Sequence, residues 1–170
     1  MKAIVAVDLN WGIGFQGQLL ERIPEDMKFF KEKTLGKNII MGRETLESLP
    51  GKKPLKDRTN IVLTTNRSYN NENIKICHSL KELFQETEKY AKEEVFVIGG
   101  ESVYSQLLSY CSECYVTKIE NTYEADKYFT DLDKENIWKL VWQSEEKKYN
   151  DISFKFAKYI NENPKRQNRI

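Results

Sequence analysis

The chain has 170 residues, 27 basic and 26 acidic side chains, and a formal net charge of +1. This length favours one domain with a proper core, and an apolar share of 39% is typical of a globular protein. The balanced charge gives no reason to expect nucleic acid or a membrane surface as a partner, and no apolar run approaches a membrane span. The acidic Asp8 comes too early for a signal peptide. Three cysteines, an odd number, fit a reducing compartment, so we expect a cytoplasmic protein.

Strands and helices are predicted to alternate along most of the chain. Apolar, β-branched runs predict buried strands at residues 3–7, 38–41, 60–65, 74–77, 94–98 and 114–119. Helices are expected at about 24–36, 44–49, 80–90 and 102–109, and a glycine-containing loop at 8–22. Ser79 should cap the third helix, with Glu82 completing a capping box. Two alternating strands at 138–144 and 152–159 surround a charged turn and predict a β-hairpin.

This order predicts an α/β fold with a single domain. The central sheet should be mostly parallel, with flanking helices and a C-terminal antiparallel hairpin. We expect the domain to cover residues 1–160, and residues 161–170 to form a frayed polar tail.

Asp26 is the most informative residue of the chain. It follows Pro24, which suits the first helical position because its missing N–H would have no partner there. Ile23, Met27 and Phe30 share one face of that helix. A carboxylate beside such an apolar stripe is costly to bury without a partner. The alternative is an acid in water, favoured in the first turn by the helix dipole.

Three segments at the ends of predicted strands are candidates for phosphate contact, at residues 42–45, 63–67 and 98–102. Ligands of such sheets bind beyond the carboxyl ends of the strands. Free N–H groups at a helix start bind anions, and glycines allow close backbone approach. Each segment alone has an ordinary alternative, a tight turn or a solvated cation. Together they indicate an extended ligand with several phosphates, such as a dinucleotide, although the G-x-G-x-x-G fingerprint is missing.

Several sequence blocks carry a resemblance over residues 3–159. They include Ala6-Val7-Asp8, Ile23-Pro24-Glu25-Asp26, Ile40-Met41-Gly42-Arg43, Arg58-Thr59-Asn60-Ile61-Val62-Leu63, Val97-Ile98-Gly99-Gly100 and Tyr115-Val116-Thr117. In the order and spacing of these blocks the chain resembles the dihydrofolate reductase family. The resemblance implies that family's fold and the NADPH-dependent reduction of 7,8-dihydrofolate to 5,6,7,8-tetrahydrofolate, an oxidoreductase step of folate and one-carbon metabolism.

The resemblance also implies how four residues take part in the reaction. Hydride goes from C4 of the nicotinamide to C6 of the pterin, and N5 gains a proton by way of water. Asp26 would bind the pterin's 2-amino group and N3, and Thr117 would orient Asp26. Tyr104 would lie beside the nicotinamide, the alternative being simple helix packing. Glu21 replaces a common tryptophan, and it could hold the water near the pterin or point to solvent.

Two sets of binding residues follow from the same resemblance. The substrate pocket would comprise Ile4, Val5, Asp26, Met27, Phe30, Leu49, Leu55, Arg58, Ile98 and Thr117. Arg58 would bind the α-carboxylate of the glutamate tail as a fork. The cofactor groove would comprise Ala6, Ile13, Gly14, Leu19, Gly42, Arg43, Thr45, Leu63, Thr64, Thr65, Ile98, Gly99, Gly100, Ser102, Val103 and Tyr104.

Several positions depart from the family's familiar pattern. The 2′-phosphate of NADPH should rest on Arg43 with Thr64 or Thr65, but Glu44 and Ser102 remove positive charge from this groove. Ala125-Asp126 replaces a usual Gly-Asp pair in a loop that would touch the region of Leu19.

The remaining candidates favour no second site. His78 is the only histidine, so a His-based metal site or a serine–histidine triad has little support, and no metal is predicted. Cys111 and Cys114 form a single C-x-x-C, for which burial is the favoured interpretation.

Two other functions remain as alternatives. One is a related pteridine or pyrimidine reductase, against which Arg58 argues. The other is a folate- or nucleotide-binding module without turnover, against which Asp26 and Thr117 argue. The expected partners are dihydrofolate and antifolate-type small molecules, and we expect a monomer.

Overall fold

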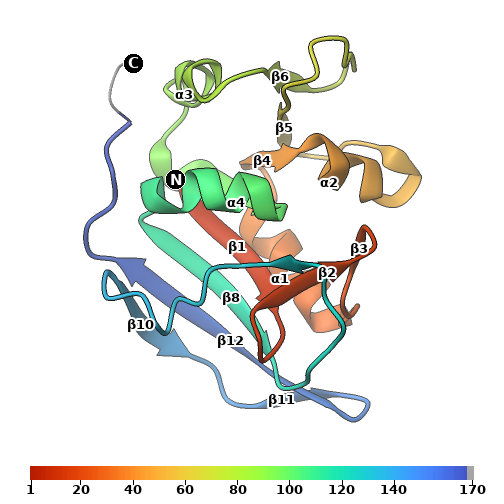
Figure 1. Cartoon of the computed structure of the whole chain (residues 1–170), viewed down its shortest axis with the longest axis vertical. Coiled ribbons are helices and arrows are strands. Elements are labelled where there is room, and N and C mark those ends of the chain that lie inside the picture. The colour runs from red at the N-terminus through yellow and green to blue at the C-terminus, as the bar shows by residue number, and fades with distance from the viewer. Residues whose placement is uncertain (168–170) are drawn as a thin grey trace.

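The computed structural model describes residues 1–167, and its main feature is one twisted sheet (Figure 1). The sheet order is β10-β12-β8-β1-β7-β4-β5-β6, and β11 pairs with β12. The strands are β1 (Lys2–Val7), β4 (Asn38–Gly42), β5 (Thr59–Leu63), β6 (Lys75–Cys77), β7 (Val95–Gly99), β8 (Glu113–Ile119), β10 (Trp138–Gln143), β11 (Lys147–Tyr149) and β12 (Ile152–Asn161). The six strands from β8 to β6 pair in parallel, whereas β12 runs antiparallel to β8, β10 and β11. The predicted mostly parallel α/β sheet is confirmed.

Four α-helices flank this sheet within the described residues. They are α1 (Pro24–Thr34), α2 (Arg43–Ser48), α3 (Leu80–Thr87) and α4 (Glu101–Leu107), and short 3-10 turns cover Pro50–Lys52, Lys92–Glu94 and Leu108–Tyr110. Ser79 caps α3 as predicted, because its hydroxyl accepts a hydrogen bond from Glu82 N at 3.2 Å. The Glu82 carboxylate accepts instead from His78 N at 2.7 Å, one residue before the position that a capping box uses. None of these helices is long and apolar enough to cross a membrane.

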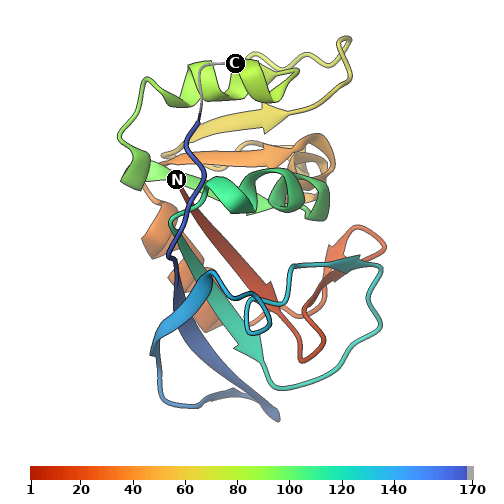
Figure 2. The ribbon, with the colours of Figure 1, turned by 60° about the vertical axis from the view of Figure 1, so that its left-hand side comes forward.

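The central strands bury both of their faces, which explains why they appear in the sequence as unbroken apolar runs. On one face Ile40, Ile61 and Val97 pack with Leu83 of α3 and Leu107 of α4. On the other face lie Ile4, Ile39, Met41, Val62 and Phe96, together with Leu46 of α2 and the half-buried Phe29 and Phe30 of α1. Figure 2 shows the helices distributed over the two sides of the sheet. The faces alternate residue by residue, as the strand geometry requires.

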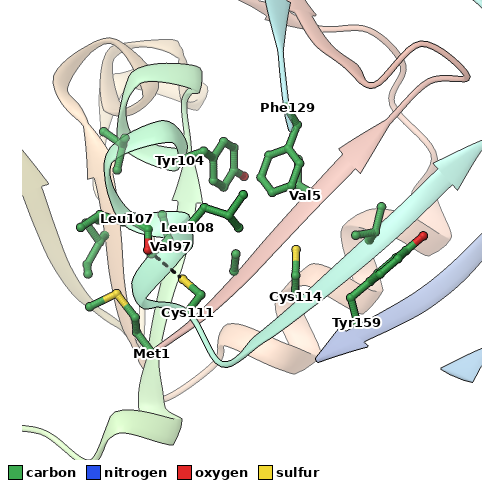
Figure 3. Close-up of a cluster of buried hydrophobic side chains, with 14 of the residues drawn as sticks. Met1, Val5, Val97, Tyr104, Leu107, Leu108, Cys111, Cys114, Phe129 and Tyr159 are labelled. Carbon is green, nitrogen blue, oxygen red and sulfur yellow. Dashed lines mark hydrogen bonds between the residues drawn. The ribbon is translucent and has the colours of Figure 1, made fainter. Parts of the chain in front are cut away.

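The predicted burial of the cysteines is confirmed. Cys111 and Cys114 are free and buried in the same core cluster as Leu107 and Leu108, and Cys111 lies next to Leu107 (Figure 3). Burial raises the pKa of the Cys111 thiol to about 12 and that of Cys114 well above its ordinary value. Both thiols therefore stay protonated and pack as small apolar groups.

The segment 8–22 is more ordered than the predicted loop. It contains β2 (Gly12–Phe15) and β3 (Gln18–Leu19), which form a second sheet with β9 (Lys127–Tyr128) in the order β3-β2-β9. Gln16 and Gly17, with φ of 48° and 76°, form the two-residue connection between β2 and β3. Two positive φ values are typical of the tight hairpin turns that match strand twist. This hairpin was not predicted from the sequence, because glutamine does not favour such a turn.

The end of the chain is also held longer than predicted. Asn161 belongs to β12, is buried, and donates from its side chain to Cys111 O at 3.0 Å. Lys165 N donates to Ser109 O at 2.8 Å. The expected fraying is therefore wrong for residues 161–165, where backbone hydrogen bonds continue past the predicted boundary, and residues 168–170 lie outside the described residues.

Candidate active site

Asp26 is a buried acid in the first turn of α1. Pro24 opens the helix, and Ile23 before it offers no side-chain cap. Asp26 is only 8% exposed, and its Oδ1 accepts a 2.6 Å hydrogen bond from the Thr117 hydroxyl of β8. Burial raises the pKa of Asp26, and the bond from Thr117 lowers it less, so the pKa lies above its ordinary value. The alternative of a solvated first-turn acid is therefore wrong.

A row of side chains leads from Asp26 along α1 to Arg58. Phe30 and Thr34 follow Asp26 at four-residue intervals on the same helix face. The Arg58 guanidinium donates from Nε to the Thr34 hydroxyl at 2.9 Å and lies 6.0 Å from the Phe30 ring centroid. From Asp26 to Thr34 the helix spans about 12 Å. An elongated ligand with donors at one end and an anion at the other fits this row.

Most of the predicted pocket residues gather on the same side of the sheet. Ile4, Phe30, Leu49, Leu55 and Ile98 belong to one apolar cluster. Met27 is 38% exposed, beside Asp26 on the helix. Val5 differs, since its side chain lies in the cluster on the opposite face of the sheet. Its expected contribution to the pocket wall is therefore restricted to backbone atoms.

Tyr104 packs in the core and makes one specific hydrogen bond. Its hydroxyl donates to the Ile4 carbonyl at 2.6 Å, and its ring meets Phe129 edge-on at 4.8 Å (Figure 3). Burial raises the pKa of Tyr104 well above the ordinary value of a phenol. The hydroxyl is thus a fixed donor that joins α4 to β1. The packing alternative and a role at the site are both compatible with this geometry.

Glycines lie at the carboxyl ends of β4 and β7, which are neighbouring strands. A Cβ added at Gly100 would lie 3.3 Å from the Thr45 hydroxyl, and one at Gly42 would lie 3.2 Å from Val103. Gly99 has a φ of 129°, a conformation that other residues rarely adopt. The glycines therefore allow the strand ends and the helices that follow them to pack closely where the sequence places phosphates. These features fit a dinucleotide lying across the two strand ends.

The expected 2′-phosphate region has a more complex charge pattern than the sequence suggested. Arg43 donates to the Glu47 carboxylate at 2.8 Å, and its guanidinium also lies 3.8 Å from Glu44. His78 lies close by, with Nδ1 2.9 Å from the carbonyl oxygen of Thr64. No sequence pattern predicted this proximity, which arises because β5 and β6 are paired neighbours. Thr65 and Ser102 are exposed, and Leu63 is half-buried against the core.

The segment before α1 brings Glu21 close to residues predicted for the cofactor groove. Glu21, Leu19 and Ile13 line a small hollow together with Ala6 of β1. The Glu21 carboxylate accepts from the Tyr123 hydroxyl at 3.1 Å and from Arg22 N at 3.1 Å. Gly14 is buried in β2 and pairs with Leu19. Glu21 thus points toward Tyr123, a residue for which the sequence predicted no role.

Comparison with known proteins identifies the family. The family model described as dihydrofolate reductase matches residues 1–161. The chain belongs to the dihydrofolate reductase family. It is 36% identical over 162 residues to the dihydrofolate reductase of Bacillus subtilis (strain 168), covering 94% of both chains. It is 38% identical over 138 residues to that of Staphylococcus haemolyticus, covering 81% of this chain and 80% of the relative.

A solved structure agrees with this assignment. Dihydrofolate reductase from Enterococcus faecalis, complexed with NADP(H) and RAB-propyl, superposes with a TM-score of 0.84 at 35% identity, covering 94% of this chain and 95% of that one. The predicted fold, enzyme class and cofactor are confirmed: the chain is an NADPH-dependent oxidoreductase that reduces dihydrofolate. Within residues 1–167 no cluster of histidine, cysteine and acidic side chains could hold a metal ion.

Asp26 should lower the stability of the ligand-free protein at neutral pH. Its folded-state pKa is raised, so the folded state binds the proton more readily than the unfolded state. The associated stability is present below the ordinary pKa of 3.8 and is lost as pH rises through the raised value. Asp26→Asn should therefore raise the melting temperature at pH 7, by about 2–4 °C for each kcal/mol gained. Calorimetry at pH 7 and pH 4 should show a smaller gain at pH 4, and a gain that grows on acidification would contradict the raised pKa.

Proposed function

We propose that Asp26, Thr117, Tyr104 and Arg58 carry the reduction of 7,8-dihydrofolate to 5,6,7,8-tetrahydrofolate in this chain. The observation that carries the proposal is the buried 2.6 Å bond between Thr117 and Asp26 at the head of the row on α1. The pterin binds at Asp26, the middle of the substrate packs on Phe30, and the glutamate tail reaches Arg58. Leu49, Leu55 and Ile98 form the apolar walls, with Ile4 beneath.

Asp26 recognises the pterin and sets its electrostatic surroundings. Its carboxylate accepts hydrogen bonds from the 2-amino group and N3, while the Thr117 hydroxyl keeps Oδ1 in place. NADPH, when bound, supplies the hydride that C6 of the pterin accepts. The apolar walls exclude water from this face, which strengthens the field of the buried carboxylate. The proton for N5 arrives through water, which the nearby negative charge favours.

The cofactor groove follows the glycine-lined strand ends. Gly42, Gly99 and Gly100 let the backbone approach the pyrophosphate, with Thr45 and Val103 beside them. Ala6, Ile13, Gly14 and Leu19 enclose the nicotinamide end, and Tyr104 fixes β1 beneath it. Thr64, Thr65, Leu63, Ser102 and Arg43 serve the adenosine end. His78 extends this set, since it contacts Thr64.

Further proposals concern the enzyme's ligands, its domain and oligomeric state, and its location in the cell. Antifolate-type molecules are proposed as ligands, supported by the complex of the Enterococcus faecalis relative with RAB-propyl. A single domain over residues 1–160 is supported by its central sheet and by the family match over residues 1–161, and we propose that it acts as a monomer. A cytoplasmic location is supported by three free, buried cysteines.

Asp26→Asn should leave the fold intact and lower turnover at pH 7 by about 10²–10⁴, the span for loss of a group that assists protonation. Activity should recover partly at low pH, where solvent protonates the substrate. Steady-state rates with dihydrofolate and NADPH measure this effect. Glu25→Gln is the matched control, since Glu25 is an exposed neighbour in the same turn that pairs with Lys147 at 3.3 Å. Near-normal activity of Asp26→Asn at pH 7 would refute the assignment.

Arg58→Leu should weaken dihydrofolate binding by about 2 kcal/mol, because the substrate carboxylate loses a charged hydrogen-bond partner. An inhibitor without a glutamate tail should bind almost as it does to the wild type. Fluorescence titration with both ligands gives the two affinities. An equal loss for both would mean that Arg58 acts through its bonds to Thr34 and Lys56 and holds the fold instead.

Arg43→Ala should raise the Michaelis constant for NADPH by about tenfold and leave that for NADH nearly unchanged. This is the lower end of the range for a charge-assisted hydrogen bond, because Glu47 already shares the guanidinium. Glu47→Gln should lower the Michaelis constant for NADPH, because it frees Arg43 from its ion pair. Steady-state kinetics with both cofactors measure these effects. Equal losses for NADPH and NADH would place selectivity elsewhere, at Thr65 or His78.

A further inference from the structure

Asn60 is a buried amide near the start of β5. It is only 4% exposed, and Val62, two residues further along the same strand face, belongs to the apolar cluster that also contains Leu55 and Phe30. An amide in such surroundings is costly to bury unless its donors and its acceptor are hydrogen-bonded. The partners of Asn60 lie in the segment 55–58, directly before the strand.

The Asn60 side chain makes three hydrogen bonds to backbone groups of this segment. Oδ1 accepts from Leu55 N at 3.0 Å, and Nδ2 donates to Leu55 O at 2.9 Å and to Arg58 O at 3.2 Å. Leu55 and Arg58 are the two residues of the segment whose side chains belong to the proposed substrate pocket. One buried amide therefore fixes the backbone of both.

The Arg58 guanidinium is oriented by two further bonds. Nε donates to the Thr34 hydroxyl at 2.9 Å, and Nη1 donates to Lys56 O at 2.7 Å. The Thr34 hydroxyl itself donates to Phe30 O at 2.8 Å, so it can only accept from Arg58. A substrate carboxylate would meet Nη2 and the second N–H of Nη1. Because Lys56 and the Arg58 backbone belong to one segment, a shift of that segment would move the whole fork.

The middle of the segment is weakly held by comparison. Lys56 and Asp57 are exposed, and Asp57 has a φ of 57°. Gly36 N donates to Asp57 O at 2.8 Å. Backbone bonds of such exposed residues open more easily than buried ones. Asn60 is thus the buried anchor of a segment whose other residues face solvent.

We propose that Asn60 is a positioning residue that places Arg58 for the carboxylate at the tail of the substrate. It acts through the backbone of the segment 55–58 and touches neither substrate nor cofactor. The proposal rests on the proposed function, because the position of Arg58 matters only if Arg58 binds that carboxylate.

The competing explanation is that Asn60 only stabilises the fold. Asn161 shows what such a residue looks like in this chain. It is also 4% exposed, its amide donates to Cys111 O at 3.0 Å, and its Oδ1 accepts from Asn163 N at 2.9 Å. These bonds join the end of β12 to the turn after α4, and none of the three residues belongs to the proposed site. The two asparagines therefore separate a loss of stability from a loss of substrate recognition.

The experiment follows steady-state turnover with NADPH and two substrates. Dihydrofolate carries the tail, whereas 6-methyl-7,8-dihydropterin has the reacting ring without it. Asn60→Ala should raise the KM for dihydrofolate by about tenfold, less than Arg58→Leu does, because the guanidinium remains but is misplaced. The kcat for dihydrofolate and the kcat/KM for the dihydropterin should stay within about twofold of the wild type, since the reacting ring lies at the other end of the row.

The double variant Asn60→Ala/Arg58→Leu tests whether the effect acts through Arg58. Its KM for dihydrofolate should match that of Arg58→Leu, because the position of the side chain no longer matters once the guanidinium is gone. A further loss of about tenfold would mean that Asn60 affects the pocket independently of Arg58, and it would overturn the proposal.

Asn161→Ala is the matched control. Like Asn60→Ala, it should lower the melting temperature, because each substitution removes a buried amide and leaves its backbone partners unpaired. It should leave the KM for both substrates unchanged. Asn60→Ser is a milder variant, whose hydroxyl can keep one of the three bonds. It should show the same pattern with a smaller loss, and it decides the question if Asn60→Ala does not fold.

The outcomes separate positioning from stability. A lowered melting temperature with a normal KM for dihydrofolate in the Asn60 variants would overturn the proposal. Equal losses for dihydrofolate and the dihydropterin would also overturn it, because the whole site would then be disturbed. If Arg58→Leu itself leaves the KM for dihydrofolate unchanged, the proposed role of Arg58 fails and this inference fails with it. If Arg58→Leu raises that KM and the Asn60 variants do not, the proposed function stands and only the positioning role is refuted.

Discussion

The structure of the site depends on one buried carboxylate. Asp26 sits in the first turn of α1 and is held by Thr117, which belongs to a strand in the middle of the sheet. An ionised group in such surroundings is costly unless it is hydrogen-bonded. The bond from Thr117 ties the first turn of α1, which Pro24 opens, to β8. The row of Phe30, Thr34 and Arg58 follows from that start, because each is placed by helix geometry or by a bond to it.

The parallel topology explains how distant segments meet at this carboxylate. The carboxyl ends of β1, β4 and β7 lie at one edge, as do the segments that leave them. Tyr104 from α4 reaches the Ile4 carbonyl on the central strand, and glycines at the ends of β4 and β7 allow close packing beside it. The small β3-β2-β9 sheet covers the exit of β1. Recognition groups therefore converge from six or more places in the sequence without any long loop of their own.

Sequence patterns predicted the parts of this arrangement that arise from local physics. The apolar runs predicted β4 and β7, and Pro24 predicted the helix start that places Asp26. The β2–β3 hairpin was missed because its turn uses Gln16 in place of a residue that favours positive φ. Contacts between distant residues left no signal: His78 meets Thr64 across a strand pair, and Tyr123 meets Glu21 across 102 residues. The pairing of Arg43 with Glu47 was visible as an i, i+4 spacing, but its effect on the groove depended on rotamers.

Two carboxylates of this chain show why Asp26 suits ligand binding. Asp133 and Asp26 each accept a 2.6 Å bond from a hydroxyl, of Tyr159 and Thr117 respectively. Burial pulls the pKa of Asp133 upward, but its bonds to Lys118 and Tyr159 outweigh this, and the pKa falls below its ordinary value. The pKa of Asp26 rises instead, and no cation among residues 1–167 forms a salt bridge with it. The lysine makes the first carboxylate a satisfied structural group. Without such a partner, the second retains an unneutralised charge that donors of a bound pterin can satisfy.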